Sequence, residues 1–398
     1  MTLRRCDNGE VRERPPDEPR YRDALAHLGE VRSLEHLATP ALVCDLDRFA
    51  HNLERMASMA AEAGVALRPH VKSHKSSYVA RRQLDAGAVG LAVAKLSEAE
   101  SILVALRADG NDASISTLIT SPLAGEALAR RAVELATRCS LLVVVDSVEG
   151  VIELARAAHG KADVGVLCDV DVGLGRTGVA DVEQALRVVE EILSHPQLRF
   201  EGAQGYGGHL QHVKGRAQRR DATKRSTDRF AEVVMALESR GVTVALRTGG
   251  GTGTAAIDVE LGVLNELQCG SYVFMDREYR DALGDDLEGR YEQSLFIATT
   301  VISTNQANFV TVDAGLKAMA TDAGTPLVEG HDEARYGFFG DEQGFIVPGS
   351  DDDFPRGQRL MLVPPHCDPT VDRYDVMWLA RGDVIEDVVR VTARGCSQ

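Results

Sequence analysis

The chain has 398 residues, of which 44% are hydrophobic, 5% aromatic and 26% charged, which excludes a disordered or collagen-like chain and predicts a substantial core. Its 60 acidic and 44 basic residues give a formal net charge of −16, which argues against a protein that binds nucleic acid through positive charge. The sequence contains no apolar stretch of membrane-spanning length, and its first residues lack the apolar core of a signal peptide. We therefore expect a cytoplasmic protein of two domains that binds neither nucleic acid nor a membrane.

The seven cysteines are scattered singly, with no CxxC pair and no spacing typical of a disulfide framework. Most of them stand among apolar residues, so we interpret them as small buried hydrophobic side chains. A reducing compartment is consistent with this pattern.

Residues 1–38 are charged and contain prolines, and we expect them to form an arm that lies over another surface or subunit, with order beginning near Thr39. From there, short β-branched or apolar runs alternate with amphipathic helical stretches. The runs predicted as strands are 39–46, 67–72, 90–94, 114–120, 141–146, 164–171, 198–204, 242–250 and 267–274.

The helical stretches between these strands show apolar stripes on one face, as helices that cover a sheet do. Asp181 and Gln184 resemble a capping box at the start of the helical stretch that begins at Val182. The three clearest stripes are Phe49, Leu53, Met56 and Ala60; Val182, Leu186, Val189 and Leu193; and Phe230, Val233, Val234 and Leu237.

Strand and helix alternate at a spacing of roughly 30 residues, which is typical of parallel pairing. Eight strands, from 67–72 to 267–274, would close a (β/α)8 TIM-type barrel of the α/β class, so we place the barrel domain at 39–275. The run 39–46 is a ninth strand and is expected to join a second domain. That domain, 276–398, contains strand-like runs without a clear helix between them and is predicted to be all-β.

The densest polar cluster is RPHVKSHK at 68–75, at the end of the first predicted barrel strand. Alternate residues of a strand share a face, so we expect His70, Lys72 and His74 to point together. A lysine at the C-terminal mouth of a barrel lies where barrel enzymes keep their chemistry, and neighbouring cations with partial burial would lower its pKa. A neutral Lys72 amine could form a Schiff base with an aldehyde; a solvated basic loop is the alternative.

The segment GLGRTG at 173–178 matches the dinucleotide-binding pattern GxGxxG and follows a predicted strand. The next helix is expected to begin near Asp181, after the third glycine, whereas a dinucleotide site needs the helix to open within the glycines. Asp169 and Asp171 would also repel a pyrophosphate. We therefore interpret the segment as a loop that directs Arg176 into the barrel mouth, and a nucleotide-dependent oxidoreductase is a distant alternative.

The segment RTGGGTGT at 247–254 follows a strand late in the barrel. Backbone N–H groups of glycines can converge on an anion, and the loops after the last barrel strands often hold a phosphate. The interleaved hydroxyls favour phosphate binding over a merely tight turn. Gly270, Ser271 and Tyr272 could complete the phosphate site.

Two further segments carry imidazoles. In GGHLQH, just beyond a predicted barrel strand, His209 or His212 could reach the barrel mouth and act as a general base near neutral pH. In PPHCDPT, His366 and Asp368 are separated by one residue, so in extended backbone they could bind one divalent cation together. Manganese, magnesium or zinc would suit these ligands, with positions left for water or substrate; an ordinary polar turn is the alternative.

The sequence resembles the D-threonine aldolase group of pyridoxal-phosphate enzymes, which is related to D-serine dehydratase and 3-hydroxy-D-aspartate aldolase and has the alanine-racemase-like fold type. The resemblance covers the chain from about Thr39 to the C-terminus. It is carried by RPHVKSHK, KLSEAE, DVGLGRTGV, the Gln211–His212 pair, GGGTGT, NELQCGSYVFMD, VDAGLKA and PPHCDPT.

The resemblance implies a homodimer with active sites near the subunit interface. It implies that Lys72 binds pyridoxal 5′-phosphate covalently, that His366 and Asp368 bind the divalent metal, and that His212 is the catalytic base. The residues predicted to bind the cofactor are Lys72, Arg176, Tyr206, Gly250, Gly251, Thr252, Gly270, Ser271 and Tyr272.

The implied reaction is cleavage of a D-configured β-hydroxy-α-amino acid to glycine and an aldehyde. Two departures from the family pattern, Ala94 in place of a glutamine and the segment 371–375 in place of an NxHD-like one, leave threonine, phenylserine and hydroxyaspartate types open as substrates. The dehydratase relatives tend to have cysteine where this chain has Asp368, which favours the aldolase. A dehydratase on the same scaffold and a non-catalytic pyridoxal-phosphate-binding protein are the alternatives.

Overall fold

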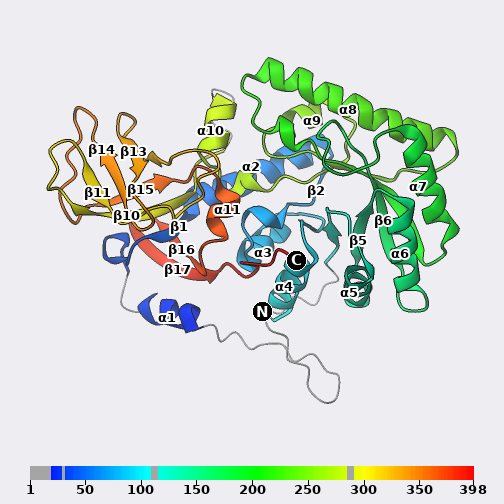
Figure 1. Ribbon diagram of the computed structural model, residues 1–398, viewed down its shortest axis with the longest axis horizontal. Coiled ribbons are helices and arrows are strands. Elements are labelled where there is room, and N and C mark those ends of the chain that lie inside the picture. The colour runs from blue at the N-terminus through cyan, green and yellow to red at the C-terminus, as the bar shows by residue number, and fades with distance from the viewer. Residues whose placement is uncertain (1–18, 29–31, 109–114, 285–290) are drawn as a thin grey trace, which may run out of the picture.

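The computed structural model describes residues 19–28, 32–108, 115–284 and 291–398. Two domains lie side by side along the longest axis of the molecule (Figure 1). In one, helices surround a sheet; the other, the strand-rich domain, is built mainly of a second sheet. No helix in these described ranges is long and apolar enough to cross a membrane.

The first sheet confirms the predicted (β/α)8 barrel. Its eight parallel strands run in the order β2-β9-β8-β7-β6-β5-β4-β3, and the N–H groups of Val89 and Ala92 donate to the carbonyls of Leu67 and Pro69, which joins β2 to β3 and closes the ring. The strands are β2 (Ala66–Leu67), β3 (Leu91–Val93), β4 (Thr117–Ile119), β5 (Leu141–Val145), β6 (Val164–Asp169), β7 (Leu198–Gly205), β8 (Leu246–Gly249) and β9 (Glu266–Leu267).

Helices surround the barrel on its outer face (Figure 1), and the apolar stripe predicted on the first of them is buried against the core. The Asp45 carboxylate caps this helix by accepting the N–H groups of Asp47 and Arg48, and Gly64, with φ of 64°, ends it in the left-handed region. The helices are α2 (Leu46–Ala63), α3 (Ser77–Asp85), α4 (Leu96–Ala108), α5 (Glu126–Ala136), α6 (Val148–Ala158), α7 (Val182–Ser194), α8 (Arg216–Ser239) and α9 (Ala255–Leu261).

The stripe predicted on α7 is rotated from the face that the structure buries. The buried residues are Ala185, Val188, Val189 and Ile192, whereas Leu193 is 57% exposed. The pattern of large side chains misplaced the face because it gave no weight to Ala185, which is fully buried. The predicted cap is present, since the Asp181 carboxylate accepts the N–H of Gln184 at 2.8 Å.

The second sheet is built around the strand expected at 39–46. This strand, β1, pairs antiparallel with β10 and parallel with β16, in the order β13-β14-β11-β10-β1-β16-β17, while β15 pairs with β10 and β12. The strands are β1 (Ala41–Asp45), β10 (Leu295–Ser303), β11 (Val310–Val312), β12 (Leu327–Val328), β13 (Arg335–Phe338), β14 (Gly344–Val347), β15 (Arg359–Val363), β16 (Val376–Arg381) and β17 (Val384–Arg390).

Two expectations about the ends of the chain need correction. The segment predicted to lack helices contains α10 (Arg277–Leu283) and α11 (Cys367–Val371), which are too short for apolar periodicity to reveal. Before Thr39, where order was expected to begin, the chain forms α1 (Pro19–Leu28) and the 3-10 turn η1 (Leu34–His36). Residues 1–18 and 29–31 of the expected arm lie outside the described residues.

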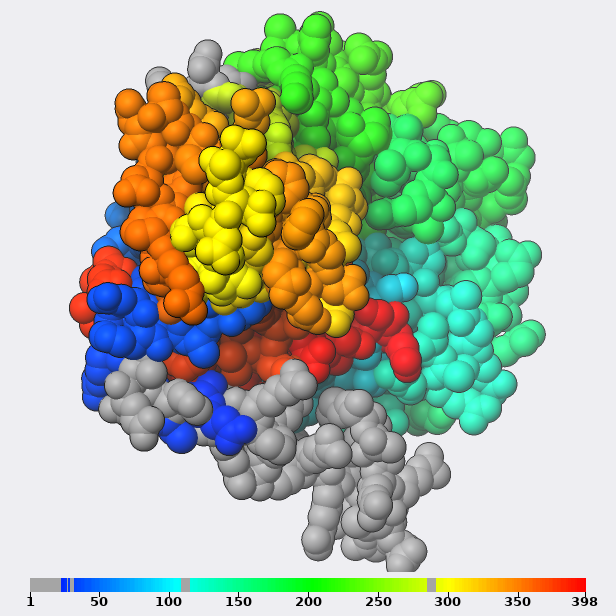
Figure 2. All heavy atoms as spheres, turned by 60° about the vertical axis from the view of Figure 1, so that its left-hand side comes forward, coloured from blue at the N-terminus to red at the C-terminus, as the bar shows by residue number. Residues whose placement is uncertain are grey.

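The tail after β17 returns to the barrel and joins the two sheets. Its Ala393 N–H donates to the Lys75 carbonyl at 2.8 Å, and the N–H of Ser97 donates to the carbonyl of Gln398 at 3.0 Å. Figure 2 shows this red segment between the strand-rich domain in front and the barrel at the right. The C-terminus is therefore anchored close to the barrel mouth rather than projecting from the sheet.

The corrected face of α7 can be tested with two neighbouring residues. Ile192→Ala should lower the free energy of unfolding by about 2–5 kcal/mol, because it leaves a cavity at a fully buried position. Leu193→Ala should change it by less than about 0.5 kcal/mol, because that side chain is mostly exposed. Thermal and urea unfolding of both variants would measure the difference, and an equal loss in the two would contradict the burial described here.

Candidate active site

The lysine predicted to hold a cofactor lies on a turn rather than on a strand. The strand β2 ends before Pro69, which has no N–H for a sheet ladder, and the 3-10 turn η2 (Val71–Ser73) carries Lys72. The expectation that His70, Lys72 and His74 share a strand face is therefore wrong. Each of these side chains leaves the turn towards a different partner.

The two histidines beside Lys72 are buried and bound to neutral groups. His70 Nε2 lies 3.0 Å from the Thr120 hydroxyl, and burial lowers the pKa of His70 to about 3. His74 Nε2 lies 3.2 Å from the Gln83 side-chain oxygen, and burial lowers the pKa of His74 to about 4. Both imidazoles are uncharged at pH 7, so they are not the neighbouring cations that were expected to affect Lys72.

The Lys72 ammonium contacts the Asp368 carboxylate, which comes from the strand-rich domain. Burial lowers the pKa of Lys72, but the negative charge of Asp368 outweighs it and raises this pKa above its ordinary value. The expected lowering of the Lys72 pKa is therefore not present in this state of the protein. Burial raises the pKa of Asp368, but Lys72 and His366 together hold it well below its usual range, so the pair is ionised.

The two predicted metal ligands lie at the start of α11: His366 has extended backbone but Asp368 is helical, so they do not form the extended pair that was expected. His366 is the N-cap residue of this helix and Asp368 lies in its first turn. His366 Nδ1 is 2.7 Å from the Asp322 carboxylate, and the Ser271 hydroxyl donates to Asp368 at 3.3 Å. Among the described residues no cluster of three His, Cys, Asp or Glu side chains could hold a metal.

His212 follows the 3-10 turn η3 (Gly208–Leu210) and is held on one side by α10. Its Nδ1 lies 3.5 Å from the Glu278 carboxylate, and its ring centroid is 4.6 Å from that of Tyr279. Its Nε2 is buried and has no hydrogen-bond partner within the described structure. Burial lowers the pKa of His212, and His366, Asp368 and Lys72 lie close enough to affect it. An uncharged imidazole with a vacant buried acceptor could therefore take a proton from a ligand.

The loop after β6 matches the interpretation that excluded a dinucleotide site. Asp171 accepts hydrogen bonds from the N–H groups of Gly173 and Gly175, both at 2.9 Å, so these donors are not available for a pyrophosphate. The exposed Arg176 places its guanidinium carbon 5.7 Å from the centre of the Tyr206 ring. Tyr206 in turn lies close enough to Lys72 to affect its pKa, so this loop borders the site.

The glycine loop after β8 is packed against the segment that carries His212. A Cβ at Gly251 would lie 2.5 Å from the Gln211 side-chain oxygen, and the same oxygen accepts the N–H of Gly253 at 3.0 Å. Gly250 has φ of 69°, and a Cβ there would lie 2.5 Å from the Asp258 carboxylate. Side chains are thus excluded where the backbone must approach its neighbours.

The second glycine segment lies against the turn that carries Lys72. A Cβ at Gly270 would lie 2.7 Å from the His70 carbonyl oxygen. The next residues form the 3-10 turn η4 (Ser271–Val273), and Ser271 reaches Asp368 as described above. The structure therefore places Gly270 and Ser271 beside the turn that carries Lys72, and their part in a phosphate site stays a prediction.

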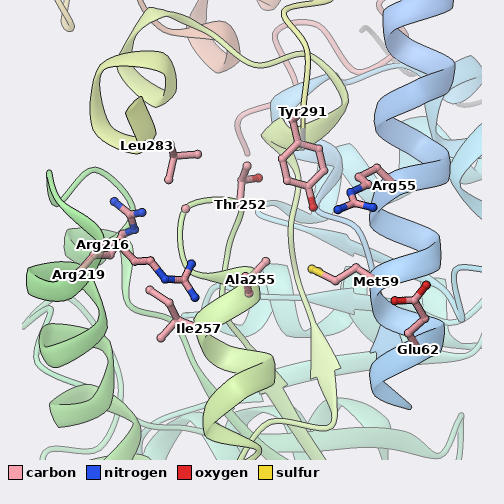
Figure 3. A pocket seen from close by; sticks show the side chains of 12 residues that line it. Arg55, Met59, Glu62, Arg216, Arg219, Thr252, Ala255, Ile257, Leu283 and Tyr291 are labelled. Carbon is pink, nitrogen blue, oxygen red and sulfur yellow. The ribbon is translucent and has the colours of Figure 1, made fainter. Parts of the chain in front are cut away.

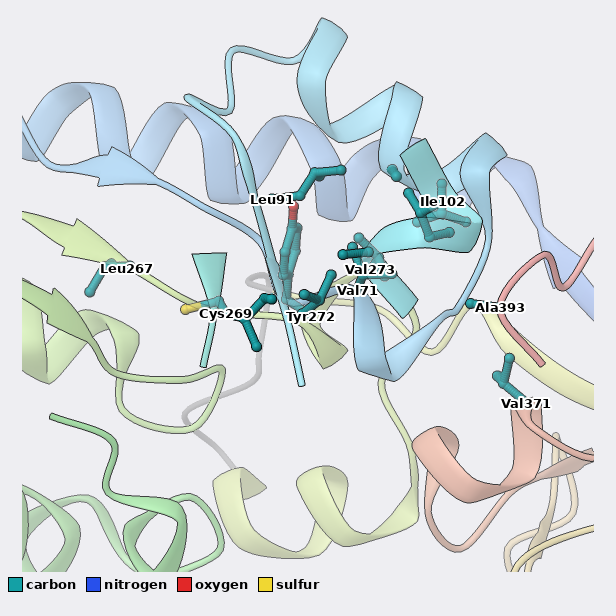
Figure 4. Packing of buried hydrophobic residues seen from close by; sticks show 14 of the residues in the cluster. Val71, Leu91, Ile102, Leu267, Cys269, Tyr272, Val273, Val371 and Ala393 are labelled. Carbon is teal, nitrogen blue, oxygen red and sulfur yellow. The ribbon is translucent and has the colours of Figure 1, made fainter. Parts of the chain in front are cut away.

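The side chains of Thr252 and Tyr272 point elsewhere. Thr252 lines a cavity of about 220 Å³ with residues of α2 and α8, and neither Lys72 nor His212 borders this cavity (Figure 3). Tyr272 is packed in the core (Figure 4), where its hydroxyl accepts a hydrogen bond from Gln83 at 3.3 Å. The assignment of these two residues to a phosphate site stays a prediction; the Thr252 hydroxyl is buried and has no hydrogen-bond partner among the described residues.

Several residues at this site had no role in the sequence analysis. Glu278 and Tyr279 support His212, Asp322 supports His366, and Gln211 ties two loops together. Asp276 ends the segment NELQCGSYVFMD and was quoted without a function. An aspartate just before a helix is a capping signal, but α10 was too short to be recognised as a helix.

The comparisons with known proteins agree with this geometry. A family model described as alanine racemase, N-terminal domain, matches residues 44–278, and one described as putative serine dehydratase domain matches residues 294–380. The 3-hydroxy-D-aspartate aldolase of Paracoccus denitrificans (strain Pd 1222) is 36% identical over 366 residues, which cover 90% of this chain and 92% of that protein. The D-threo-3-hydroxyaspartate dehydratase of Delftia sp. (strain HT23) is 30% identical, over 83% of this chain and 91% of that protein.

Among solved structures, the crystal structure of D-threonine aldolase from Filomicrobium marinum superposes with a TM-score of 0.86 at 35% identity, covering 92% of this chain and 98% of that one. The protein has the alanine-racemase-like fold, in which a lysine at the mouth of an eight-stranded barrel here faces a carboxylate from a strand-rich domain. The chain belongs to this family of pyridoxal-phosphate enzymes, in the group that contains D-threonine aldolase and 3-hydroxy-D-aspartate aldolase.

The buried Asp258 beneath the glycine loop gives a test by pH. Burial raises the pKa of Asp258 from 3.8 to about 7, although a hydrogen bond from Thr254 opposes this. Between about pH 4 and pH 7, the range that separates the two pKa values, Asp258 binds a proton in the folded protein but releases it in the unfolded chain. The free energy of unfolding of the wild type therefore falls as the pH rises. Asp258→Asn cannot ionise, so its stability relative to the wild type should increase from pH 4 to pH 7. Parallel unfolding curves for the two proteins across this range would contradict the assignment.

Proposed function

We propose that the protein is a pyridoxal-phosphate- and divalent-metal-dependent lyase that cleaves a D-β-hydroxy-α-amino acid to glycine and an aldehyde. One observation carries the proposal: Lys72 contacts Asp368 across the two domains, beside the vacant and buried Nε2 of His212. The names of the aldolase relatives, which match the chain over most of its length, support it.

The residues around Lys72 fit the cofactor. At Gly250 and Gly270 a side chain would collide with neighbouring atoms. Because these residues have no side chain, the backbone N–H groups of their loops can come close to a phosphate. Lys72 would hold the cofactor, and the exposed Arg176 is a cation at the same mouth. When bound, pyridoxal phosphate supplies an electron sink for the bond that breaks.

The residues at the start of α11 fit a divalent cation. Asp368 already holds a cation, the Lys72 ammonium, and the charge of Asp368 raises the pKa of His366 against the effect of burial, so the two donors are close. An imidazole nitrogen and a carboxylate oxygen suit manganese, magnesium or zinc, and the cation would lower the pKa of the substrate hydroxyl. His366 and Asp368 would hold this cation.

His212 is the base in this proposal. Its lowered pKa keeps the imidazole uncharged at pH 7, so Nε2 can accept the proton of the β-hydroxyl. Once Nε2 is protonated the ring carries a positive charge, which strengthens its interaction with the Glu278 carboxylate beside Nδ1. Tyr279 packs against the ring and limits its rotation.

A dehydratase on the same scaffold is the second candidate. The match of residues 294–380 to a serine dehydratase domain and the dehydratase relative favour it, whereas Asp368 in place of a cysteine favours the aldolase. A non-catalytic carrier of pyridoxal phosphate would have no use for the His366 and Asp368 pair. From the family resemblance we also propose a homodimer located in the cytoplasm.

Product analysis tests the function. The purified protein should convert a D-β-hydroxy-α-amino acid, but not its L isomer, to glycine and aldehyde, and EDTA should abolish the reaction until Mn²⁺ is restored. The substrates to compare are D- and L-threonine, D-phenylserine and D-3-hydroxyaspartate. A keto acid with ammonia would identify the dehydratase, and activity that is insensitive to EDTA would contradict the metal site.

His212→Ala should reduce kcat by about 10²- to 10⁴-fold, because a positioned base is lost. Borohydride should still fix the pyridoxyl group to Lys72 in this variant, since His212 does not hold the cofactor. His209→Ala is the matched control: this histidine lies on the same loop but is exposed, and its removal should leave kcat within a small factor of the wild type. Near-normal turnover by His212→Ala would remove His212 from the mechanism.

A further inference from the structure

One buried carboxylate, that of Asp276, caps two helices at once. Its Oδ1 accepts the N–H of Tyr279 in the first turn of α10, at 2.9 Å. Its Oδ2 accepts the N–H of Cys367, the first residue of α11, at 2.8 Å. Asp276 is fully buried, so both bonds are shielded from water.

The connection between the two helix ends is reciprocal. The N–H of Arg277 donates to the carbonyl of Pro364 at 3.0 Å, and the N–H of Glu278 donates to the carbonyl of Pro365 at 3.2 Å. The segment that leads into α11 therefore binds the free donors of α10, while Asp276 binds the first donor of α11. Helices of 7 and 5 residues are not stable alone, so such contacts decide where they lie.

Each helix carries one half of the proposed chemistry. Glu278 and Tyr279 on α10 hold His212, and α11 carries Asp368 in its first turn with His366 as its N-cap. The mutual position of base and metal ligands is thus set by the junction at which Asp276 lies. A small displacement there would separate groups that have to act on one oxygen atom.

We propose that Asp276 is a positioning residue that fixes His212 relative to the His366 and Asp368 pair. It acts through the two helix ends and touches neither substrate nor cofactor. The inference rests on the proposed function, because it assigns Asp276 to that same site. It predicts that weakening either cap lowers metal affinity and kcat without lowering cofactor content.

Asp276→Asn tests both caps together. A carboxamide has one acceptor oxygen, and its NH2 group would oppose one of the two backbone donors. In the cofactor-loaded protein the dissociation constant for Mn²⁺, measured by electron paramagnetic resonance, should rise by about 10- to 100-fold, as for other residues that orient metal ligands. The kcat should fall while KM and the borohydride-fixed pyridoxyl content stay close to the wild type.

Asp181→Ala is the control for a purely structural role, because alanine at an N-cap lowers the stability of a protein. Asp181 also caps a helix, accepting the N–H of Gln184 at 2.8 Å, but that helix is α7, which carries none of the residues assigned to the site. This variant should lower the melting temperature and leave Mn²⁺ affinity unchanged. Loss of stability by itself therefore cannot imitate the effect expected of Asp276→Asn.

Cys367→Pro removes the α11 cap alone, in case Asp276→Asn fails to fold. Proline lacks the N–H but suits the first helical position, and His366, with φ of −143° and ψ of 122°, has the extended backbone that precedes a proline. Cys367→Ala removes the same thiol and keeps the N–H, so it is the matched baseline. Mn²⁺ affinity should be about 10-fold or more lower in Cys367→Pro than in Cys367→Ala.

The outcomes separate this inference from the proposed function. Wild-type protein that binds Mn²⁺ and releases glycine, with variants that match their controls, would overturn the role of Asp276 and leave the function standing. Wild-type protein that binds no Mn²⁺ would overturn the metal site and, with it, the positioning role.

Discussion

The contact between the Lys72 ammonium and the Asp368 carboxylate joins the two domains at the candidate active site, to which each domain contributes one of these charged groups. Both groups are partly buried, and either charge without the other would be costly in that position. The barrel contributes the lysine on the turn after β2, and the strand-rich domain contributes the carboxylate on α11. The 3-10 turn η2 and the helix α11 therefore lie against each other.

A second cluster of charges beside the first fixes this junction. The Lys75 ammonium lies 3.2 Å from both the Glu98 and the Asp372 carboxylates, and the tail binds the Lys75 backbone through Ala393. Glu98 also accepts the N–H of Ala94 at the start of α4. The KLSEAE segment, which contains Glu98, therefore has a structural explanation: through Lys75 it connects α4, the turn that carries Lys72 and the C-terminal end of α11.

The sequence predicted the barrel well and the local geometry of the site poorly. Alternating apolar runs revealed the eight strands, and the pairing of β1 (Ala41–Asp45) with the other sheet was expected from the surplus strand. The strand predicted at 67–72 gives way at Val71 to the 3-10 turn η2, so an argument based on alternating faces did not apply to Lys72. Glu278 and Asp322 were missed because they belong to short or irregular segments that have no periodicity.

By itself, the sequence determined the two-domain architecture, the position of the candidate lysine and the pairing of a histidine with an aspartate near the C-terminus. These features depend on local patterns, because periodic burial and short-range spacing are written along the chain. Only the tertiary structure decided that Asp368 raises the pKa of Lys72 and that Tyr272 faces the core. Lys72 and Asp368 are 296 positions apart, and Tyr272 is 189 positions from its hydrogen-bond partner Gln83. Spacing in the chain carries no information about such contacts.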